Sequence, residues 1–370
     1  MTRADKLKNL DRSISEYNQY VISHNVKHVN LFFDGLNHFV RNFLPSYGSL
    51  QDSSSKDVSG LYYSIKSLIA ILKSFTSSTI SRNDLTPYLI FEHRRSKKLN
   101  MIYPAYKQNR KLPKVLTLDE VEKNEMFKYN LVEFISFCQL FPGDLMTFNV
   151  DYVEGDFVIA YLIYYLSSKA TEKTLNIIVS TDKDFYQLLN LDNVMVFNPI
   201  SNVLITSDNF NTVLRLSTQI SPSSFLIYKL LVGDKSDNIE RFAGNSTSLK
   251  TINMLNSLTE SSISSLQDLF SLTENVLNDK KIKLQKRQYD LLTNIAENKD
   301  KLLTIFKIID LSYTNVLNIL STNDILKIMS IYENTTTRNE NRHDALKNFF
   351  NKHNFSTDFL FDVEHFLFKR

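Results

Sequence analysis

Cysteine is almost missing from this sequence: Cys138 is the single one among 370 residues. One thiol excludes a disulfide framework and a zinc site built from several cysteines. Long apolar runs are missing too, and no stretch approaches the roughly 20 residues that a membrane-spanning helix needs. The first 25 residues are charged and polar, without the apolar segment of a signal peptide. We therefore expect a cytoplasmic protein without membrane partners.

An excess of either charge is also absent. Lys and Arg total 43 and Asp and Glu total 40, so the net charge is +3. Overall charge therefore gives no indication of a nucleic-acid partner, and any basic surface must be local. Apolar residues make up 43% of the chain, as is ordinary for a globular protein. A chain of this length can bury a large core, in one large domain or two.

The first 210 residues alternate short apolar runs with amphipathic stretches. The apolar runs predict strands at 29–33, 87–91, 145–150, 175–179, 194–197 and 203–205. Apolar residues at helical spacing predict helices at 3–22, 36–44, 57–75, 118–139, 153–168 and from Phe185 onward. This alternation is typical of an α/β fold with a mostly parallel central sheet flanked by helices. After residue 207 the strands stop, and the remainder of the chain is predicted to be helical.

Acidic side chains stand at the ends of four predicted strands. They are Asp34, Glu92, the pair Glu154 and Asp156, and the pair Asp182 and Asp184. Acids at helix starts are ordinary because they cap free N–H groups, so for one cluster alone that structural interpretation is the better one. Recurrence at four strand ends changes the balance, because the carboxyl ends of parallel strands meet at one edge of a sheet.

So many converging carboxylates would repel one another unless cations lie among them. Hard oxygen ligands suit Mg²⁺ or Mn²⁺. Two such ions, roughly 3.5–4 Å apart, stabilise the attacking and leaving oxygens of a phosphoryl displacement. The acids therefore predict a two-metal site for phosphoryl chemistry.

Residues 93–114 form a local basic strip that contains no acid. Its cations are Arg94, Arg95, Lys97, Lys98, Lys107, Arg110, Lys111 and Lys114. Tyr103 and Tyr106 are interleaved with them. Basic residues with aromatics are the expected footprint of a nucleic-acid backbone, although a solvated loop would also carry such charges. Together with the acids, the strip predicts metal-dependent phosphodiester hydrolysis.

The chain resembles the 5′ nuclease family, which comprises flap endonucleases, the 5′-3′ exonuclease domains of bacterial DNA polymerases, and bacteriophage ribonuclease H and 5′-exonuclease proteins. Five motifs carry the resemblance in order between residues 29 and 255. They are Phe33-Asp34-Gly35, Tyr106-Lys107-Gln108-Asn109-Arg110, Glu154-Gly155-Asp156-Phe157, Ser180-Thr181-Asp182-Lys183-Asp184-Phe185 and Gly233-Asp234-Lys235-Ser236-Asp237-Asn238-Ile239. Each motif alone is weak, but five in order are specific. Because no polymerase domain follows, the chain is most similar to the stand-alone bacteriophage proteins.

The resemblance implies a PIN-like nuclease core with two Mg²⁺ or Mn²⁺ ions. The carboxylates of Asp34, Glu92, Glu154, Asp156 and Asp182 would surround the first ion, and those of Asp184, Asp234 and Asp237 would hold the second. Asp151 stands where bacteriophage relatives tend to have an Asp. Lys107 would contact the scissile phosphate, with Arg110 in support. Nucleic-acid contacts would come from Arg94, Arg95, Lys97, Lys98, Tyr103, Tyr106 and Lys250.

The resemblance also implies a division of the chain and a set of partners. Residues 1–27 would form an N-terminal helical extension, and 28–210 the nuclease core, with a basic arch at 93–140. Residues 211–370 would be a helical DNA-binding and C-terminal region, whose helix-three-turn-helix often holds a potassium ion. Substrates would be DNA with 5′ ends or flaps, or RNA–DNA hybrids during primer removal. A polymerase or a single-strand-binding protein would be the partner in replication or repair.

Four features depart from the family pattern. The family's Arg about eight residues before the motif Lys falls near Leu99 in this chain, where Lys97 or Lys98 would take its place. Glu92 replaces an Asp, so its carboxylate reaches one methylene further. Phe157 replaces a second Asp, and its apolar neighbours predict a helix face buried against the sheet. The turn at 241–251 keeps a single Gly, Gly244, which weighs against potassium binding there.

Two other functions fit parts of the pattern. A phosphatase with an aspartyl nucleophile could begin at Asp34, but its general acid would stand two residues later, where this chain has Leu36. A non-catalytic structure-specific DNA-binding protein could keep the same fold. Loss of several carboxylates would favour it, whereas eight remain.

Overall fold

A six-stranded sheet forms the centre of the protein. The computed structural model describes residues 2–52, 54–76, 80–111, 117–215, 219–244, 251, 254–255, 257–259, 263–279, 281–334 and 341–368. Its strands are β1 (His28–Asp34), β2 (Leu85–Arg94), β3 (Met146–Asp151), β4 (Thr174–Val179), β5 (Val194–Asn198) and β6 (Val203–Ile205). They lie in the order β3-β2-β1-β4-β5-β6. Strands β1 to β5 pair in parallel and β6 pairs antiparallel to β5. The prediction of a mostly parallel α/β sheet is therefore confirmed.

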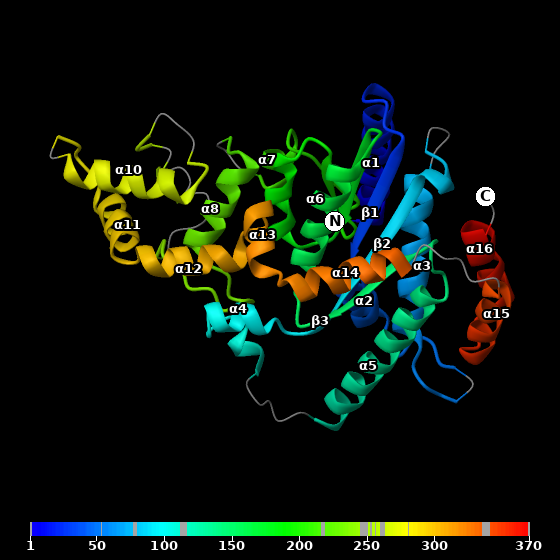
Figure 1. Cartoon of the computed structure of the whole chain (residues 1–370). Helices are drawn as coiled ribbons and strands as arrows, with labels where there is room; N and C mark the ends of the chain where they lie inside the picture. The colour runs from blue at the N-terminus through cyan, green and yellow to red at the C-terminus, as the bar shows by residue number, and fades with distance from the viewer. Residues whose placement is uncertain are drawn as a thin grey trace.

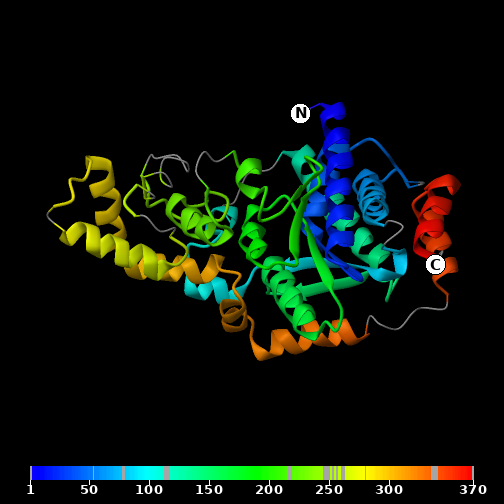
Figure 2. The same cartoon turned by 90° about the horizontal axis from the view of Figure 1, so that it is seen from above.

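Helices cover both faces of this sheet (Figures 1 and 2). One face carries α1 (Arg3–Ser23), α2 (Gly35–Ser46), α3 (Ser59–Phe75), α5 (Leu118–Gln139), α15 (Arg342–Lys352) and α16 (Thr357–Phe368). The other face carries α6 (Gly155–Lys169), η3 (Lys183–Asn190), α7 (Phe210–Val213), α8 (Pro222–Val232) and α14 (Thr322–Asn334). The same hydrophobic cluster continues away from the sheet into α10 (Leu266–Asn278), α11 (Lys286–Glu297), α12 (Lys299–Ile309) and α13 (Tyr313–Ile319). Shorter segments are η1 (Arg82–Asp84), α4 (Lys97–Ile102) and η2 (Gln108–Lys111).

Alternate side chains of the central strands enter two different cores. In β1, Leu31 and Phe33 join the cluster under α2 and α3, whereas Phe32 joins the cluster under α6. In β4, Ile177 and Ile178 divide in the same way. A strand buried on both faces is apolar along most of its length, which is why these strands were evident in the sequence. The exceptions, Asn30 in β1 and Asn176 in β4, satisfy each other, since the Asn30 side-chain amide donates to Asn176 Oδ1 at 2.9 Å.

The direction of the strand crossings creates a crevice at the carboxyl edge of the sheet. From β1 the chain adds β2 and β3 on one side, and it then crosses back to add β4 and β5 on the other. In open α/β sheets, ligands bind at such a switch point, outside the carboxyl ends of the strands. The acids at the ends of β1 and β4 lie on either side of it.

Both ends of the chain pack onto the central domain. In α1, Tyr17 is fully buried and its hydroxyl donates to the Phe75 carbonyl at 2.9 Å. In α15, the ring of Phe349 lies 5.6 Å from that of Phe137 in α5. Figure 1 shows α15 and α16 beside α3, far from α10 and α11. The predicted domain boundaries at 27 and 210 stay predictions.

One helix differs from its prediction. The helix expected from Phe185 is a 3₁₀-helix, η3, and it begins at Lys183. The Asp182 side chain accepts a hydrogen bond from the Asp184 backbone N–H at 2.9 Å. This local bond tightens the first turn, as short Asp side chains do at helix starts. By contrast, Phe157 is buried in α6, as its sequence context predicted.

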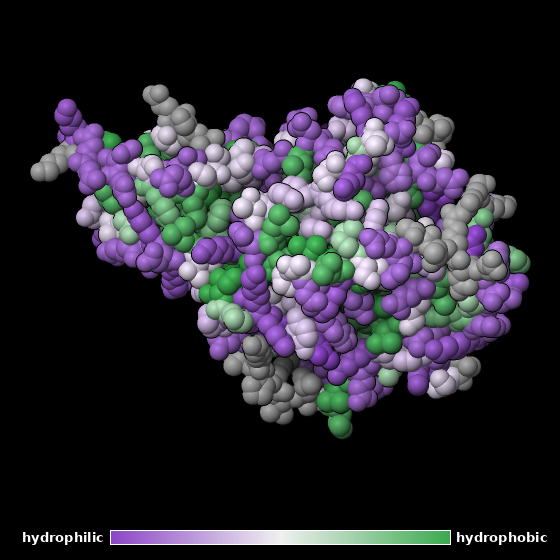
Figure 3. Space-filling model, in the orientation of Figure 1, coloured by the Kyte–Doolittle hydropathy of each residue, from purple (hydrophilic) through white to green (hydrophobic). Residues whose placement is uncertain are grey.

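Hydrophilic residues cover most of the face shown in Figure 3, and apolar residues gather below α10 and around α12 and α13. Within the described ranges, no single helix has the length and apolar composition of a membrane span. Helices α12 and α13 pass that test only as a pair, and the pair is bent by 88°.

A buried histidine joins α2 to α3. His38 Nε2 lies 3.0 Å from the Ser64 carbonyl, and Arg41 donates to His38 Nδ1 at 3.1 Å. These partners fix the neutral tautomer that is protonated at Nε2. Desolvation, together with the Arg41 charge, lowers the pKa of His38 to about 3. The unfolded chain therefore binds a proton at pH values where the folded protein does not.

We predict that His38 makes the fold sensitive to mild acid. Its contribution is constant above the unfolded pKa near 6.5 and is lost as the pH falls from there toward 3. Between pH 7.5 and pH 5, the wild type should lose about 2 kcal/mol of unfolding free energy relative to the His38→Gln variant. Urea unfolding of both proteins across this range is the measurement. Parallel stability curves would show that His38 does not titrate on unfolding.

Candidate functional site

The eight predicted metal-binding carboxylates line one pocket at the carboxyl edge of the sheet. This carboxylate pocket has a volume of about 400 Å³, and Lys107 lines it as well. Its carboxylates are those of Asp34, Glu92, Glu154, Asp156, Asp182, Asp184, Asp234 and Asp237. The structure thus brings together side chains that are spread over two hundred residues of sequence. Their role as metal ligands stays a prediction.

Strand ends and helix starts hold the first group of carboxylates. Asp34 ends β1 and caps α2, accepting from the Asn37 backbone N–H at 3.0 Å. Its second oxygen accepts from the Ser180 hydroxyl at 3.2 Å. Asp182 caps η3 in the same way, and Glu154 precedes α6. Helix capping and convergence on the pocket are therefore compatible, because capping occupies only one carboxylate oxygen of Asp34.

A tight loop brings Asp234 and Asp237 to the pocket from the helical region. The loop follows α8 at Gly233, where φ is +72° and an added Cβ would lie 2.5 Å from the Glu240 carbonyl. A glycine is required there on both counts. Asp234 and Ile239 exchange two backbone hydrogen bonds, of 3.1 and 2.8 Å, which close the loop.

Three hydrogen bonds join this loop to the basic strip. The Lys107 backbone N–H donates to the Asp237 carbonyl at 2.9 Å. The Asn238 side chain donates to the Ala105 carbonyl at 2.8 Å, and the Asn109 side chain donates to the Lys235 carbonyl at 2.8 Å. These bonds therefore fix the position of Lys107 relative to the loop that carries Asp234 and Asp237.

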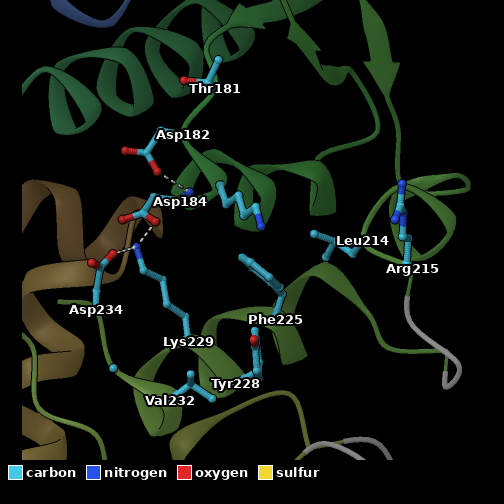
Figure 4. A pocket seen from close by; sticks show the side chains of 12 residues that line it. Thr181, Asp182, Asp184, Leu214, Arg215, Phe225, Tyr228, Lys229, Val232 and Asp234 are labelled. Atoms are coloured by element: carbon cyan, nitrogen blue, oxygen red, sulfur yellow. Dashed lines mark hydrogen bonds and ion pairs between the residues drawn. The ribbon is translucent and has the colours of Figure 1, made fainter. Parts of the chain in front are cut away.

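Two lysines form ion pairs with these carboxylates. Lys107 pairs with Glu154, and both side chains are buried. Lys229 of α8 pairs with Asp184, and its Nζ lies 3.5 Å from Asp234 (Figure 4). The sequence analysis missed Lys229. Its signal was available, since it lies in the last turn of the helix that leads directly into Gly233 and Asp234.

Carboxylate charge dominates the electrostatics of the pocket. Desolvation and the Asp182 charge raise the pKa of Asp34 to about 6. Desolvation and the Glu154 charge raise the pKa of Glu92 to about 7, and the same two causes hold the pKa of Asp156 well above its usual range. Desolvation alone would lower the pKa of Lys107, but the surrounding carboxylates, Glu154 first, raise it instead. Two lysines thus do not balance eight carboxylates.

The carboxylates are not drawn together around a single point. In the part of the chain that the structure describes, no group of three or more His, Cys, Asp and Glu side chains is arranged to hold a metal ion. Two of the carboxylates, Glu154 and Asp184, are instead turned toward lysines.

A second pocket of about 480 Å³ adjoins the first, because Asp182, Asp184 and Asp234 line both. Figure 4 shows Lys229 standing between Asp184 and Asp234, with Phe225 and Tyr228 on the neighbouring wall. Arg215 stands at the far side of this pocket. The second pocket therefore adds a cation and aromatic side chains beside the carboxylates.

The predicted nucleic-acid contacts have several different surroundings. Arg94 and Lys97 lie against the ring of Tyr152. Arg95 donates to the Lys107 carbonyl at 3.1 Å, and Lys98 donates to the Asn318 carbonyl in α13. Tyr103 is partly buried against the core. Lys250 and the side chain of Arg110 lie outside the described residues, as do most of the residues of the proposed potassium-binding turn.

Tyr106 and Asp151 occupy positions that the sequence did not indicate. Tyr106 is only 4% exposed, because its ring fills space in the core under Lys107, whose Nζ lies 4.8 Å from the ring centroid. Tyr106 is thus a core residue, and its contact with nucleic acid stays a prediction. Asp151 lies outside the carboxylate pocket, and its carboxylate is 4.0 Å from Arg94 Nε.

Comparison with known proteins gives a consistent family. A family model described as 5′-3′ exonuclease, N-terminal resolvase-like domain, matches residues 30–214, half of the chain. A 5′-3′ exonuclease of Aquifex aeolicus (strain VF5) is 26% identical over 212 residues. That match covers 57% of this chain and 63% of the relative, so the chain spans less than two thirds of the relative's length.

Solved structures from bacteriophage T5 share the fold. The T5 5′-exonuclease with bound divalent metal ions (zinc) has a TM-score of 0.63 and 18% identity, over 83% of this chain and 100% of that one. The T5 flap endonuclease, in a pseudo-enzyme-product complex with DNA and metal ions, has a TM-score of 0.62 and 16% identity, over 84% and 100% of the two chains. At this identity the likeness establishes the fold, which is the expected PIN-like nuclease fold. Because the family model matches half of this chain, the chain belongs to the 5′-3′ exonuclease family of 5′ nucleases.

Proposed function

We propose that this protein is a divalent-metal-dependent nuclease that hydrolyses phosphodiester bonds in DNA with 5′ ends or flaps. The observation that carries the proposal is the carboxylate pocket, which eight acids line together with Lys107. Cations at the neighbouring strand ends could hold the polyanionic substrate beside it. Family membership and the likeness to a DNA-bound and a metal-bound T5 protein support the same conclusion.

The residues present fit two Mg²⁺ or Mn²⁺ ions. The donors are hard carboxylate oxygens, and desolvation together with neighbouring carboxylate charge raises the pKa values of Asp34, Glu92 and Asp156. When bound, the two ions would stabilise charge on the attacking and leaving oxygens. Asp34, Glu92, Glu154, Asp156 and Asp182 would hold the first ion, and Asp184, Asp234 and Asp237 the second.

The chain's own cations would complete the reaction site. Lys107 lines the pocket and its backbone N–H donates to the Asp237 carbonyl, so its ammonium group can stabilise developing charge on the scissile phosphate. Arg110 would orient the strand in support of Lys107. We further propose action in the cytoplasm during replication or repair, with RNA–DNA hybrids as additional substrates and a polymerase or single-strand-binding protein as partner.

One observation favours a second candidate, a structure-specific DNA-binding protein without catalysis. Lys107 and Lys229 already pair with Glu154 and Asp184, so lysines could take the place of metal ions at those carboxylates. Such a protein would bind the same DNA but would gain no stability from divalent ions. Metal titration separates the two candidates.

We predict that Mg²⁺ stabilises the folded protein. At a metal concentration of 100 times Kd, binding contributes about 2.7 kcal/mol per site, which raises the melting temperature by a few degrees. The Asp182→Asn variant should melt higher than the wild type without metal, because it relieves repulsion, and should lose most of the metal-dependent gain. Asp151→Asn, which alters a carboxylate outside the pocket, is the matched control and should keep it. A melting temperature that is independent of Mg²⁺, Mn²⁺ and Ca²⁺ would support the non-catalytic candidate.

We predict metal-dependent cleavage at or near a 5′ end. The protein is incubated with Mg²⁺ and labelled flap, nicked, blunt and RNA–DNA substrates, and the cut positions are mapped. Asp182→Asn should abolish cleavage while DNA binding persists, because metal ligands and phosphate contacts are different residues. Binding of the flap substrate without any cut by the wild type would contradict the proposal, and so would normal cleavage by the variant.

We predict that Lys107 acts on the chemical step. Lys107→Ala should lower the single-turnover rate by roughly two or more orders of magnitude, the usual effect of losing one electrostatic catalytic group. Lys98→Ala is the matched control, since this lysine contacts α13, and it should change mainly the affinity and its salt dependence. If Lys107→Ala changed affinity alone, Lys107 would be a docking contact.

A further inference from the structure

Two neighbouring strands are locally distorted where they meet the carboxylate pocket. The register between β2 and β3 shifts between Glu92 and Arg94, so that Arg94 pairs with Asp151. Tyr152, which follows Asp151, has a φ of +65°, in the left-handed region. This conformation is unusual for a bulky side chain. Bulges beside functional sites commonly re-aim a side chain, and the two distortions here converge on the same place.

The distortions bring Arg94, Lys97 and Tyr152 together in what we call the tyrosine cluster. The Arg94 guanidinium donates to the Tyr152 hydroxyl at 2.6 Å, and it lies 5.3 Å from the ring centroid. Lys97 Nζ lies 4.2 Å from the same centroid. Both distances are within the range of a cation–π interaction. One tyrosine ring therefore holds two cations.

Fold stability does not account for this arrangement. The Arg94 side chain is 56% exposed, and the nearby Asp151 side chain is 47% exposed. Exposed ion pairs and exposed cation–π contacts contribute little to stability, whereas a left-handed bulky residue is costly to hold. Backbone strain that no stabilising contact offsets is a reason to look for a function.

The tyrosine cluster lies outside the lining of the carboxylate pocket and adjoins it through two chain segments. Arg94 follows Glu92 by two residues, and Tyr152 precedes Glu154 by two, and both acids line the pocket. A pocket of about 400 Å³ has the size of a small-molecule site. A duplex is far too wide to enter it, so a nucleic-acid strand whose phosphate reaches the carboxylates must be unpaired at that point. Cations beside an aromatic ring are the usual surface for an unpaired strand.

We propose that Tyr152 is a positioning residue that holds Arg94 and Lys97 as a clamp for the phosphodiester backbone of an unpaired strand beside the pocket. The inference rests on the proposed function and names the part of the substrate that this surface receives. Tyr152 acts through the two cations, which contact the phosphates. Asp151, 4.0 Å from Arg94 Nε, is the carboxylate from which an incoming phosphate would draw that cation.

The test measures binding in EDTA, so that no cleavage occurs. Two fluorescent probes are compared by anisotropy: a duplex with an unpaired 5′ tail, and the same duplex without the tail. Tyr152→Gly should weaken binding of the tailed probe about tenfold, as expected when two cation–π contacts are lost, and should leave binding of the blunt probe unchanged. Its melting temperature should stay equal or rise, because glycine suits the left-handed conformation. Tyr152→Phe keeps the ring and should stay within about threefold of the wild type.

A double-mutant cycle tests whether the tyrosine acts through the cations. Arg94→Gln combined with Lys97→Gln should weaken tailed-probe binding at least as much, and should reduce the slope of log K against log salt by about 1.4, or roughly 0.7 per phosphate contact on a single strand. Adding Tyr152→Gly to this double variant should cost nothing more. An equal additional loss would mean that the ring binds a base directly, which overturns the positioning role.

A matched control separates strain relief from the proposed role. Asn25 is also left-handed, with φ of +51°, and it is exposed at the opposite edge of the sheet, before β1. Asn25→Gly should leave binding of both probes unchanged. If Tyr152→Gly also binds the tailed probe like the wild type, the inference fails even where the wild type cleaves DNA. If the wild type binds neither probe, the proposed function itself fails.

Discussion

Repulsion among carboxylates is the physical constraint on which this site depends. Eight acids line one pocket of about 400 Å³. Desolvation alone would lower the pKa of Lys107, but four of these acids, Glu154 first, raise it. Such a concentration of charge persists only because the rest of the fold holds it in place. Parallel strands carry Asp34 and Glu92 to one edge, and helix starts fix Asp182 and Glu154 beside them. The sheet and its helices thus hold the carboxylates close together against their mutual repulsion.

The helical region completes the pocket through a few specific contacts. A loop closed by two backbone hydrogen bonds presents Asp234 and Asp237, and Lys229 holds the first of these from α8. Asn238 and Asn109 then join this loop to the basic strip. Side-chain amides and main-chain groups therefore set the position of Lys107 relative to the acids. These groups do not titrate, so they hold that position whatever the protonation state of the carboxylates.

Backbone strain gathers around the pocket. Three bulky residues, Lys107, Tyr152 and Arg215, have left-handed backbone conformations, and each lies at or beside one of the two adjoining pockets. Asn238, also left-handed, donates to Ala105 beside Lys107. Elsewhere in the described residues, left-handed non-glycine positions are Asn or Ser, which tolerate that conformation more easily. Unfavourable backbone conformations therefore occur where charged and aromatic side chains have to point toward the pockets.

The sequence by itself determined the strands and the six acids at their ends, whereas Asp234 and Asp237 were indicated only by the resemblance to a family. Doubly buried strands such as β1 are mostly apolar, and acids that follow them must meet at one sheet edge. Only the tertiary structure decided what pairs with those acids. The ion pair of Lys229 and the burial of Tyr106 depend on contacts between residues far apart in the chain. The role of Tyr152 depends on a left-handed backbone, which a tyrosine in the sequence does not indicate. Local periodicity carries no information about such contacts, because it reports which face a residue occupies and not what lies opposite that face.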